Sequence, residues 1–352
     1  MQSLSETLKE LTSRLEAGLK PVPSRLTEVS FTPNPGRLLM WQYRPANLRP
    51  GAPLVVVLHG CTQTAAAYDA GSGWSVLADR LGFALLFPEQ VPANNPQNCF
   101  NWFEPDNTAR GQGEVASVVA MVAQMVVDDR LDRRRVFVTG LSAGGALTAA
   151  LLACYPETFA AGAIVAGLPF GAATDLRSAL GAMFQGHVET GPVLGDRVRA
   201  AAPGFRGPWP RVSVWHGTAD HTVKPVNAGE SVKQWLDVHG VGGAGRTKPG
   251  DGISRTVWQD RAGTTVVEQV SVPGLGHGVP VAPSLSGVGV PGPHFLPATV
   301  SCTEDVARFF GLLPPAASVS PSRSTAPVPA ASRLLPRVLR DKLDPWRWLG
   351  GR

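Results

Sequence analysis

The feature that most constrains this chain is an aliphatic run that ends in a serine flanked by glycines and continues into small residues. Val136–Val138 leads into Gly140-Leu-Ser142-Ala-Gly144, and segment 143–154 is rich in Ala and Leu. The aliphatic run predicts a buried strand, and the Ala-rich segment predicts a helix. Glycines on both sides of a serine permit a sharp strand-to-helix turn where a Cβ would collide. A glycine-rich turn without chemistry is the alternative interpretation.

Similar aliphatic runs recur along the chain and alternate with segments of helical pattern. This alternation predicts an α/β fold, with a mainly parallel central sheet and helices on both of its faces. Residues 26–44 indicate two strands around a turn at Asn34-Pro35-Gly36, and a hairpin is expected over Ile253–Trp258 and Val266–Val272. The other expected strands and helices are Leu54–Leu58, Ala84–Phe87, Val136–Val138, Ala163–Val165 and Val212–Trp215, and 111–129, 143–154, 227–239 and 303–311.

Three parts are predicted along the chain. Residues 1–24 contain leucines at spacings of three and four, which indicate an amphipathic helix. Residues 25–314 form the α/β domain, and residues 315–352 combine a Pro- and Ser-rich linker with a basic, disordered tail. The simpler interpretation of the N-terminal helix is that it packs on the domain, and the simpler interpretation of the tail is that it is disordered. Contact with a surface or a granule is the alternative.

Composition excludes several classes of protein. The net charge is +5, and six basic residues against two acidic ones fall in the last twenty positions, so the body is nearly neutral. We therefore expect no nucleic-acid partner. The four cysteines lack Cys-x-x-Cys spacing, which argues against zinc, and their three alternative disulfide pairings stay open.

The sequence also limits the expected relation to membranes. No run reaches the roughly 18 apolar residues of a transmembrane helix. The N-terminus has no basic start followed by an apolar run, so no secretory signal is predicted. A cytoplasmic location is therefore one alternative.

Ser142 is the predicted nucleophile, and a serine hydroxyl needs a base to remove its proton. In chains built around such a turn, an acid and then a histidine follow the serine. Asp220 lies in His216-Gly-Thr-Ala-Asp220, just after the aliphatic run Val212–Trp215. Open α/β sheets build their sites at the carboxyl ends of strands, so Asp220 is the predicted acid. Ordinary turn chemistry is its alternative role.

Four histidines follow Asp220 in the sequence. His221 is too close to Asp220 to reach across to the serine, and His239 lies near a helix end. His277, in a glycine-rich loop after the last expected strand, is the predicted base. His294, in Gly-Pro-His-Phe, is the second choice.

The oxyanion that forms during attack by a serine needs backbone N–H donors. Ala143 follows the nucleophile, and Cys61 follows the strand Leu54–Leu58 in a His-Gly turn, so these two amides are the predicted donors. Asn101 and Trp102 lie in a stretch of aromatic and amide residues and are candidates for substrate binding. A buried loop anchor is the equally weighted alternative for that stretch.

Together these motifs resemble the polyhydroxybutyrate depolymerase family of esterases, which is related to feruloyl and acetylxylan esterases. The resemblance covers roughly residues 30–312 and rests on His59-Gly-Cys61, Asn98-Cys-Phe-Asn-Trp102, Gly140–Gly145, His216–Asp220 and Gly274–His277. It implies an α/β-hydrolase fold, no metal and no organic cofactor. It also implies Ser142, Asp220 and His277 as a triad and Cys61 and Ala143 as oxyanion donors.

The resemblance implies a serine esterase that hydrolyses carboxylic esters through an acyl-enzyme. A polyhydroxyalkanoate or a related short-chain ester, as polymer or small molecule, is the expected substrate, and a feruloyl or acetylxylan ester is the alternative. The alternative outside the enzymes is an inactive protein that keeps the hydrolase fold and binds a granule or another surface. Members of the family are commonly secreted, which favours an extracellular location over the cytoplasmic one.

Overall fold

The computed structural model describes residues 24–314, except residues 187 and 251. The predicted N-terminal helix and the predicted tail therefore lie outside the described residues, apart from Ser24 at the edge of the first of them. The strands are β1 (Thr27–Val29), β2 (Leu39–Tyr43), β3 (Leu54–Leu58), β4 (Ala84–Glu89), β5 (Val136–Leu141), β6 (Ala161–Val165), β7 (Arg211–Gly217), β8 (Arg246–Gly250), β9 (Ile253–Gln259), β10 (Thr265–Val272), β11 (Val279–Val281) and β12 (Phe295–Pro297).

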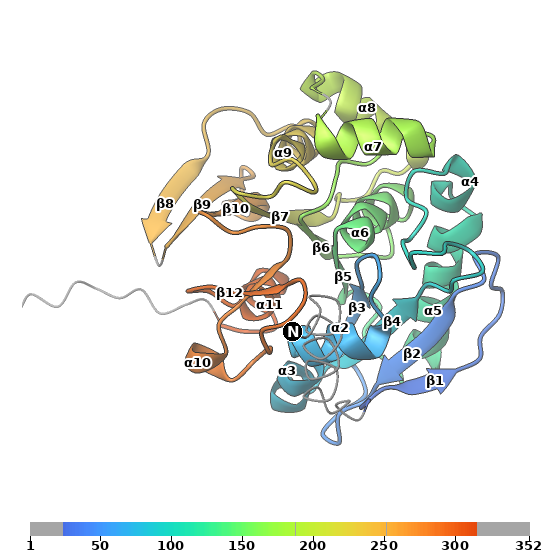
Figure 1. Cartoon of the computed structure of the whole chain (residues 1–352). Coiled ribbons are helices and arrows are strands. Elements are labelled where there is room, and N and C mark those ends of the chain that lie inside the picture. Colours follow the sequence, from blue (N-terminus) through green and yellow to red (C-terminus); the bar gives the residue numbers. More distant parts are fainter. Residues whose placement is uncertain (1–23, 187, 251, 315–352) are drawn as a thin grey trace, which may run out of the picture. The chain divides into compact units, whose positions relative to one another are not determined.

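Ten of these strands form one sheet in the order β1-β2-β4-β3-β5-β6-β7-β10-β9-β8 (Figure 1). The central pairs from β4 to β10 are parallel, while β1, β2, β9 and β8 join the two edges antiparallel. Strands β11 and β12 form a separate parallel pair. The predicted mainly parallel sheet is confirmed, and the expected pairing within 26–44 is found as β1 against β2.

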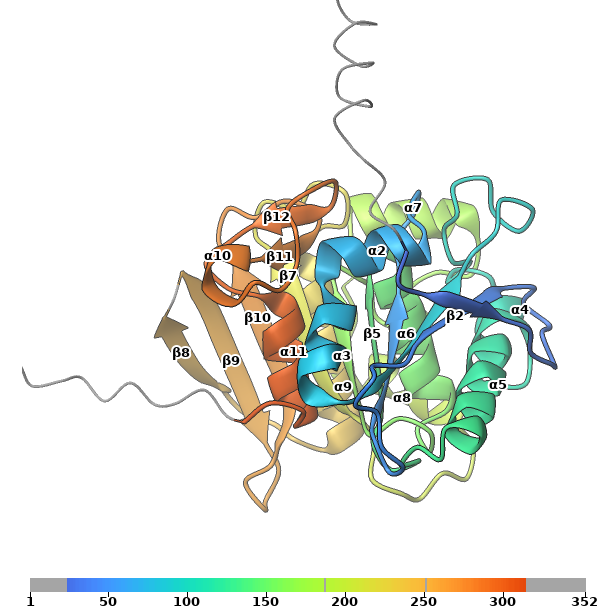
Figure 2. The same cartoon turned by 90° about the horizontal axis from the view of Figure 1, so that it is seen from below.

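Helices cover both faces of the sheet, as Figure 2 shows from below. Helices α5 (Gly113–Asp128), α6 (Ala143–Cys154) and α9 (Val226–His239) pack on one face, and α3 (Trp74–Leu81) and α11 (Cys302–Phe310) pack on the other. No helix in the described part of the chain is both long enough and apolar enough to cross a membrane. The helices are α2 (Ala65–Ser72), α3 (Trp74–Leu81), α4 (Pro105–Thr108), α5 (Gly113–Asp128), α6 (Ala143–Cys154), α7 (Leu176–Phe184), α8 (Gly191–Ala201), α9 (Val226–His239), α10 (Pro283–Ser286) and α11 (Cys302–Phe310).

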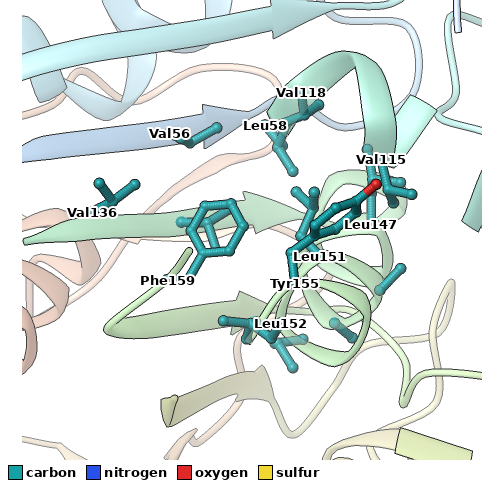
Figure 3. Packing of buried hydrophobic residues seen from close by; sticks show 14 of the residues in the cluster. Val56, Leu58, Val115, Val118, Val136, Leu147, Leu151, Leu152, Tyr155 and Phe159 are labelled. Atoms are coloured by element: carbon teal, nitrogen blue, oxygen red, sulfur yellow. The ribbon is translucent and has the colours of Figure 1, made fainter. Parts of the chain in front are cut away.

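Strand β3 shows why the central strands are continuously aliphatic. All five of its residues are buried, and successive side chains point to opposite faces of the sheet. Val56 and Leu58 belong to the cluster under α5 and α6, while Val55 and Val57 belong to the cluster under α3 and α11. The close packing of the first cluster is visible in Figure 3. Every residue of α6 is buried as well, which fixes the helix that follows Ser142.

Candidate active site

Ser142 lies in the sharp turn between β5 and α6. Its φ of 57° and ψ of −116° are a conformation that residues with a Cβ rarely adopt. The Ser142 N–H donates a hydrogen bond to the carbonyl of Val165, the last residue of β6, at 2.9 Å. Strain of this kind persists only where the surroundings hold it, and it clusters at functional sites. The turn therefore has the form expected for a nucleophile at the end of a strand.

Two glycines permit the close backbone contacts around this turn. A Cβ on Gly140 would lie 2.4 Å from the carbonyl oxygen of Gly144. A Cβ on Gly144 would lie 2.5 Å from the carbonyl oxygen of His59, in the loop after β3. These distances are far below van der Waals contact, so only glycine fits at both positions. The absence of side chains brings the start of α6 directly against the loop that carries Cys61.

Asp220 lies in the loop after β7, and its side chain is fully buried. Its Oδ1 accepts hydrogen bonds from the backbone N–H groups of Thr222 and Val223, both at 2.9 Å. Its Oδ2 lies 2.7 Å from Nδ1 of His277. Burial alone would raise the pKa of Asp220, but hydrogen bonds from His216 and His277 and from the Val223 amide outweigh burial and hold it well below its usual value. The carboxylate is therefore ionised at neutral pH.

The loop that carries His277 is held against the end of β7. Ala219 donates its N–H to the carbonyl of Leu275 at 2.9 Å, and a Cβ on Gly217 would lie 2.2 Å from the same oxygen. The predicted acid and the predicted base are thus brought together. The described residues contain no hydrogen bond from the Ser142 hydroxyl to His277, so contact between these two side chains is part of the proposal below.

The carboxyl ends of β5, β6, β7 and β10 lie level with one another in the sheet. Leu141 pairs with Val165, Val165 with Trp215, and Trp215 with Val270. Ser142 follows Leu141 directly, so it lies at the edge of the sheet where the loops after β7 and β10 begin. Sites of open α/β sheets form at this edge.

His216 is a neighbour of Asp220 that sequence reasoning did not assign a role. Its Nε2 lies 2.8 Å from the carbonyl oxygen of Val223 and 3.3 Å from Oδ2 of Asp220. The imidazole is buried, and its Nδ1 has no hydrogen-bond partner among the described residues. The available signal in the sequence was position, because His216 follows the aliphatic run Val212–Trp215 directly and precedes Asp220 by four residues. Its Nε2–H helps to hold the carboxylate that faces His277.

The other three histidines after Asp220 in the sequence have surroundings different from those of His277. His294 contacts it edge to face, with ring centroids 6.2 Å apart, and has a φ of 63°. His221 is exposed, and His239 shares a hydrogen bond of 3.0 Å with the carbonyl of Pro210. Burial lowers the pKa of His239, which suits a neutral structural role.

The two predicted oxyanion donors both have free amides. Neither Cys61 nor Ala143 donates its N–H to any group in the described part of the chain. His59 shapes the loop before Cys61: its Nε2 accepts the N–H of Gln90 at 3.1 Å, and its Nδ1 lies 2.8 Å from the carbonyl of Gly60. Burial lowers the pKa of His59 to about 4, so the ring is neutral at pH 7.

The disulfide pairing that the sequence left open is settled for one pair. Cys61 and Cys99 are joined with an S–S distance of 2.03 Å. Cys154 and Cys302 are free thiols, and both are buried. Burial raises the pKa of both thiols, so neither is poised as a nucleophile.

Asn101 and Trp102, the two candidates for substrate binding, have different surroundings. Asn101 is buried, its Nδ2 donates to Glu114 at 3.0 Å, and its Oδ1 accepts from Asn95 at 2.9 Å. These bonds are what the loop-anchor alternative expects. Trp102 is half-buried and packs on a small apolar cluster that includes Ala146, one helical turn after Ser142. It therefore remains the stronger substrate-binding candidate of the two.

Comparisons with known proteins identify the relatives of this chain. The sequence model of the family described as "Esterase PHB depolymerase" matches residues 42–256. Poly(3-hydroxyalkanoate) depolymerase C of Paucimonas lemoignei is 42% identical over 292 residues, which are 82% of this chain and 70% of that protein. An acetylxylan esterase of Coprinopsis cinerea is 34% identical over 266 residues, 73% of this chain and 70% of that protein.

A solved structure of an acetyl xylan esterase from Aspergillus awamori shares the fold. It superposes with a TM-score of 0.70 and 26% sequence identity, over 82% of this chain and 99% of that one. This similarity confirms the α/β-hydrolase fold.

Proposed function

The chain belongs to the esterase PHB depolymerase family, and from this premise we propose that Ser142, His277 and Asp220 are the catalytic triad of a serine esterase. The observation that carries the assignment is the 2.7 Å contact between Asp220 Oδ2 and His277 Nδ1. An ionised carboxylate on Nδ1 keeps the proton on that nitrogen and leaves Nε2 free to act as the base.

The reaction is acyl transfer in two steps. His277 takes the hydroxyl proton as Ser142 Oγ attacks the ester carbonyl, and the amides of Cys61 and Ala143 stabilise the oxyanion. The tetrahedral intermediate collapses, the alcohol leaves with the proton from His277, and an acyl-enzyme remains. Water then attacks the acyl-enzyme with His277 again as the base, which releases the acid and restores Ser142.

The proposed substrate is an ester of a 3-hydroxyalkanoate or a related short-chain acid. The 42% identity to a poly(3-hydroxyalkanoate) depolymerase supports this choice. The 34% identity to an acetylxylan esterase supports acetylated polysaccharide as the alternative. Initial rates on hydroxybutyrate oligomers, acetylated xylan, methyl ferulate and p-nitrophenyl esters decide between them. Highest kcat/KM on acetylated xylan or methyl ferulate would overturn the hydroxyalkanoate assignment.

A surface feature beside the site supports an apolar polymer as substrate. Leu176, Leu180 and Phe184 repeat at intervals of four on α7 and are 59%, 44% and 49% exposed. The opposite side of the same helix carries Ala182, which packs on the cluster with Ala146 and Trp102. An exposed apolar row is uncommon on a protein that meets only water. A polyester chain bound along this row would be separated from the cluster near the Ser142 turn only by the thickness of α7.

Labelling with a fluorophosphonate tests the enzyme against an inactive binding protein. An active esterase loses its activity as the reagent attaches to Ser142, which peptide mass spectrometry identifies. A folded protein that takes up no label would favour the binding protein. Label on another serine would overturn the nucleophile assignment.

An extracellular location and contact of the chain ends with polymer are further parts of the proposal. The Cys61–Cys99 disulfide supports an oxidising compartment. Fractionation of the native host tests the location, and activity confined to the cytoplasm would overturn it. Deletion of residues 1–20 or 333–352 tests the contact, because it should weaken binding to polymer particles and leave turnover of soluble esters unchanged. Unchanged binding to polymer particles would overturn the proposed contact of the chain ends with polymer.

A further inference from the structure

The loop from His59 to Gln63 presents a single free amide between two occupied ones. Gly60 donates its N–H to Oε1 of Gln63 at 2.9 Å, and Thr62 donates its N–H to the carbonyl of Gln97 at 2.6 Å. The N–H of Cys61 has no partner among the described residues. The hydrogen bonds on either side therefore fix the direction of the one donor that the proposed mechanism uses.

This loop is held in a strained conformation. Thr62 has a φ of 62°, in the left-handed region that a β-branched residue strongly disfavours. Such a conformation is strained and persists only when neighbouring contacts over-determine it. Without those contacts Thr62 would relax towards an ordinary conformation and the Cys61–Thr62 peptide would turn. The Gly60–Cys61 peptide, which carries the Cys61 N–H and is joined to it at the Cys61 Cα, would then lose its fixed direction.

The contacts that hold the loop come from residues 90–99. Gln97 accepts the Thr62 N–H, Gln90 donates its N–H to His59, and Cys99 is joined to Cys61 by the disulfide. The disulfide is the covalent member of this set, and it is attached to the same residue that carries the free amide. Both cysteines are only half-buried, so a small reductant can reach the bond.

Residues 90–101 are anchored in turn to Glu114 at the start of α5. Glu114 is 1% exposed, and it accepts hydrogen bonds from Gln90 Nε2 at 2.6 Å and from Asn101 N and Nδ2 at 2.9 and 3.0 Å. Gln90 Nε2 also donates to the carbonyl of Cys99 at 3.1 Å. A continuous set of bonds thus runs from α5 through the disulfide to the Cys61 amide.

We propose that the Cys61–Cys99 disulfide is a positioning element of the oxyanion hole, so that its reduction lowers the esterase activity reversibly. The inference rests on the proposed function, because it takes the Cys61 amide as an oxyanion donor. A donor acts only within about 2.7–3.1 Å of the oxyanion, and loss of one donor costs about 10²–10³ in kcat. A dithiol reductant converts the bond to two thiols and itself becomes a cyclic disulfide. A disulfide oxidant such as oxidised glutathione restores the bond and is itself reduced to two thiols.

The test compares wild type with the double variant C61S/C99S on a soluble p-nitrophenyl ester, well below the unfolding temperature of both. We expect kcat to fall roughly tenfold or more and KM to change less than about twofold, because the donor acts on the transition state. Binding of a trifluoromethyl ketone, which forms a tetrahedral adduct with the serine, should weaken by a similar factor. Treatment of wild type with dithiothreitol should reproduce the loss, and reoxidation should restore the rate.

Two controls separate positioning from stability. Dithiothreitol should leave the rate of C61S/C99S unchanged, and Cys154→Ser, which removes a free buried thiol, should keep the wild-type kcat. A lower unfolding temperature with unchanged kcat and ketone affinity would show that the disulfide only stabilises the fold, and this overturns the proposal. If the double variant fails to fold, reduction of folded wild type decides, with near-ultraviolet circular dichroism reporting its tertiary structure.

The inference and the proposed function can fail separately. Loss of activity in Ser142→Ala together with full activity in C61S/C99S would leave the triad intact and remove the role of the disulfide. Activity retained in Ser142→Ala would remove the triad, whatever the disulfide does.

Discussion

Asp220 and His277 meet through a single carboxylate oxygen, with Oδ2 of the acid 2.7 Å from Nδ1 of the imidazole. The other oxygen, Oδ1, is occupied by the backbone amides of Thr222 and Val223. The acid therefore cannot rotate without breaking several bonds, and the imidazole it holds is oriented in turn. This division of the carboxylate underlies the first prediction.

Asp220→Asn should lower kcat on soluble esters by about 10⁴, because an amide can stabilise the wrong tautomer of His277. The side chain keeps its size, so KM and the far-ultraviolet circular dichroism spectrum should change little. Steady-state kinetics measure the effect. A loss of less than about tenfold would show that Asp220 does not orient the base.

Ser142→Ala should abolish ester hydrolysis while the protein remains folded. The residue is almost buried at the start of a fully buried helix, and removing one hydroxyl there leaves no cavity of consequence. Progress curves over long incubations and a thermal unfolding scan are the two measurements. Activity close to wild type would assign the nucleophile elsewhere.

Gly144→Ala should destabilise the protein by roughly 1–3 kcal/mol, the usual cost of forcing extra atoms into a packed interior. Its Cβ would lie 2.5 Å from the carbonyl oxygen of His59, so the Cys61 loop or α6 must move, and kcat should fall as well. Urea denaturation and ester kinetics report the two effects.

Gly229→Ala on α9 is the matched control for Gly144→Ala. No atom lies within 4 Å of a Cβ built there, so alanine should stabilise the helix by about 0.5–1 kcal/mol and leave kcat unchanged. Equal effects of the two substitutions would remove the close-packing explanation.

The double variant L180S/F184S tests the exposed row on α7. Both side chains point away from the core, so hydrolysis of soluble p-nitrophenyl esters should be unchanged, whereas hydrolysis of a poly(3-hydroxybutyrate) suspension should fall several-fold. Release of hydroxybutyrate from the suspension is the measurement. Val127→Ser on α5, where the side chain is 75% exposed, is the control and should affect neither substrate. Equal losses on polymer in both variants would contradict a specific role for α7.

The central sheet and the order of the site residues could be predicted because both depend on local pattern. Runs such as Leu54–Leu58 are buried on both faces and must be aliphatic, and the strand-to-helix turn at Ser142 needs its glycines. The segment 279–297 carried no such pattern. Its two strands, Val279–Val281 and Phe295–Pro297, have three residues each and contain proline, so the position of His294 beside His277 could not be predicted.

The partners of Cys61 and Glu114 could not be predicted either. Cys61 and Cys99 are 38 residues apart in the sequence, and their pairing depends on how two loops meet at the end of the sheet. Glu114, in the first turn of a helix, has the sequence position of an exposed acid that favours the helix dipole, yet it is 1% exposed. Only tertiary packing reveals that it anchors residues 90–101.

Glu114 provides the last prediction, which concerns stability against pH. Burial raises the pKa of Glu114 from 4.5 to about 7, although hydrogen bonds from Asn101 and Gln90 act in the opposite direction. The folded state therefore binds more protons than the unfolded state between these values. Stability from this group is fully present below the unfolded pKa, near 4.5, and is lost as the pH rises through about 7. In that window the loss approaches on the order of 1 kcal/mol per pH unit.

Glu114→Gln should remove this part of the pH dependence. The measurement is the free energy of unfolding in urea at several pH values from 4.5 to 7.5, taken as the difference between wild type and variant. Groups common to both proteins cancel in that difference, so wild type should lose stability relative to the variant as the pH rises. A difference that stays constant with pH would show that Glu114 has the same pKa in the folded and unfolded states.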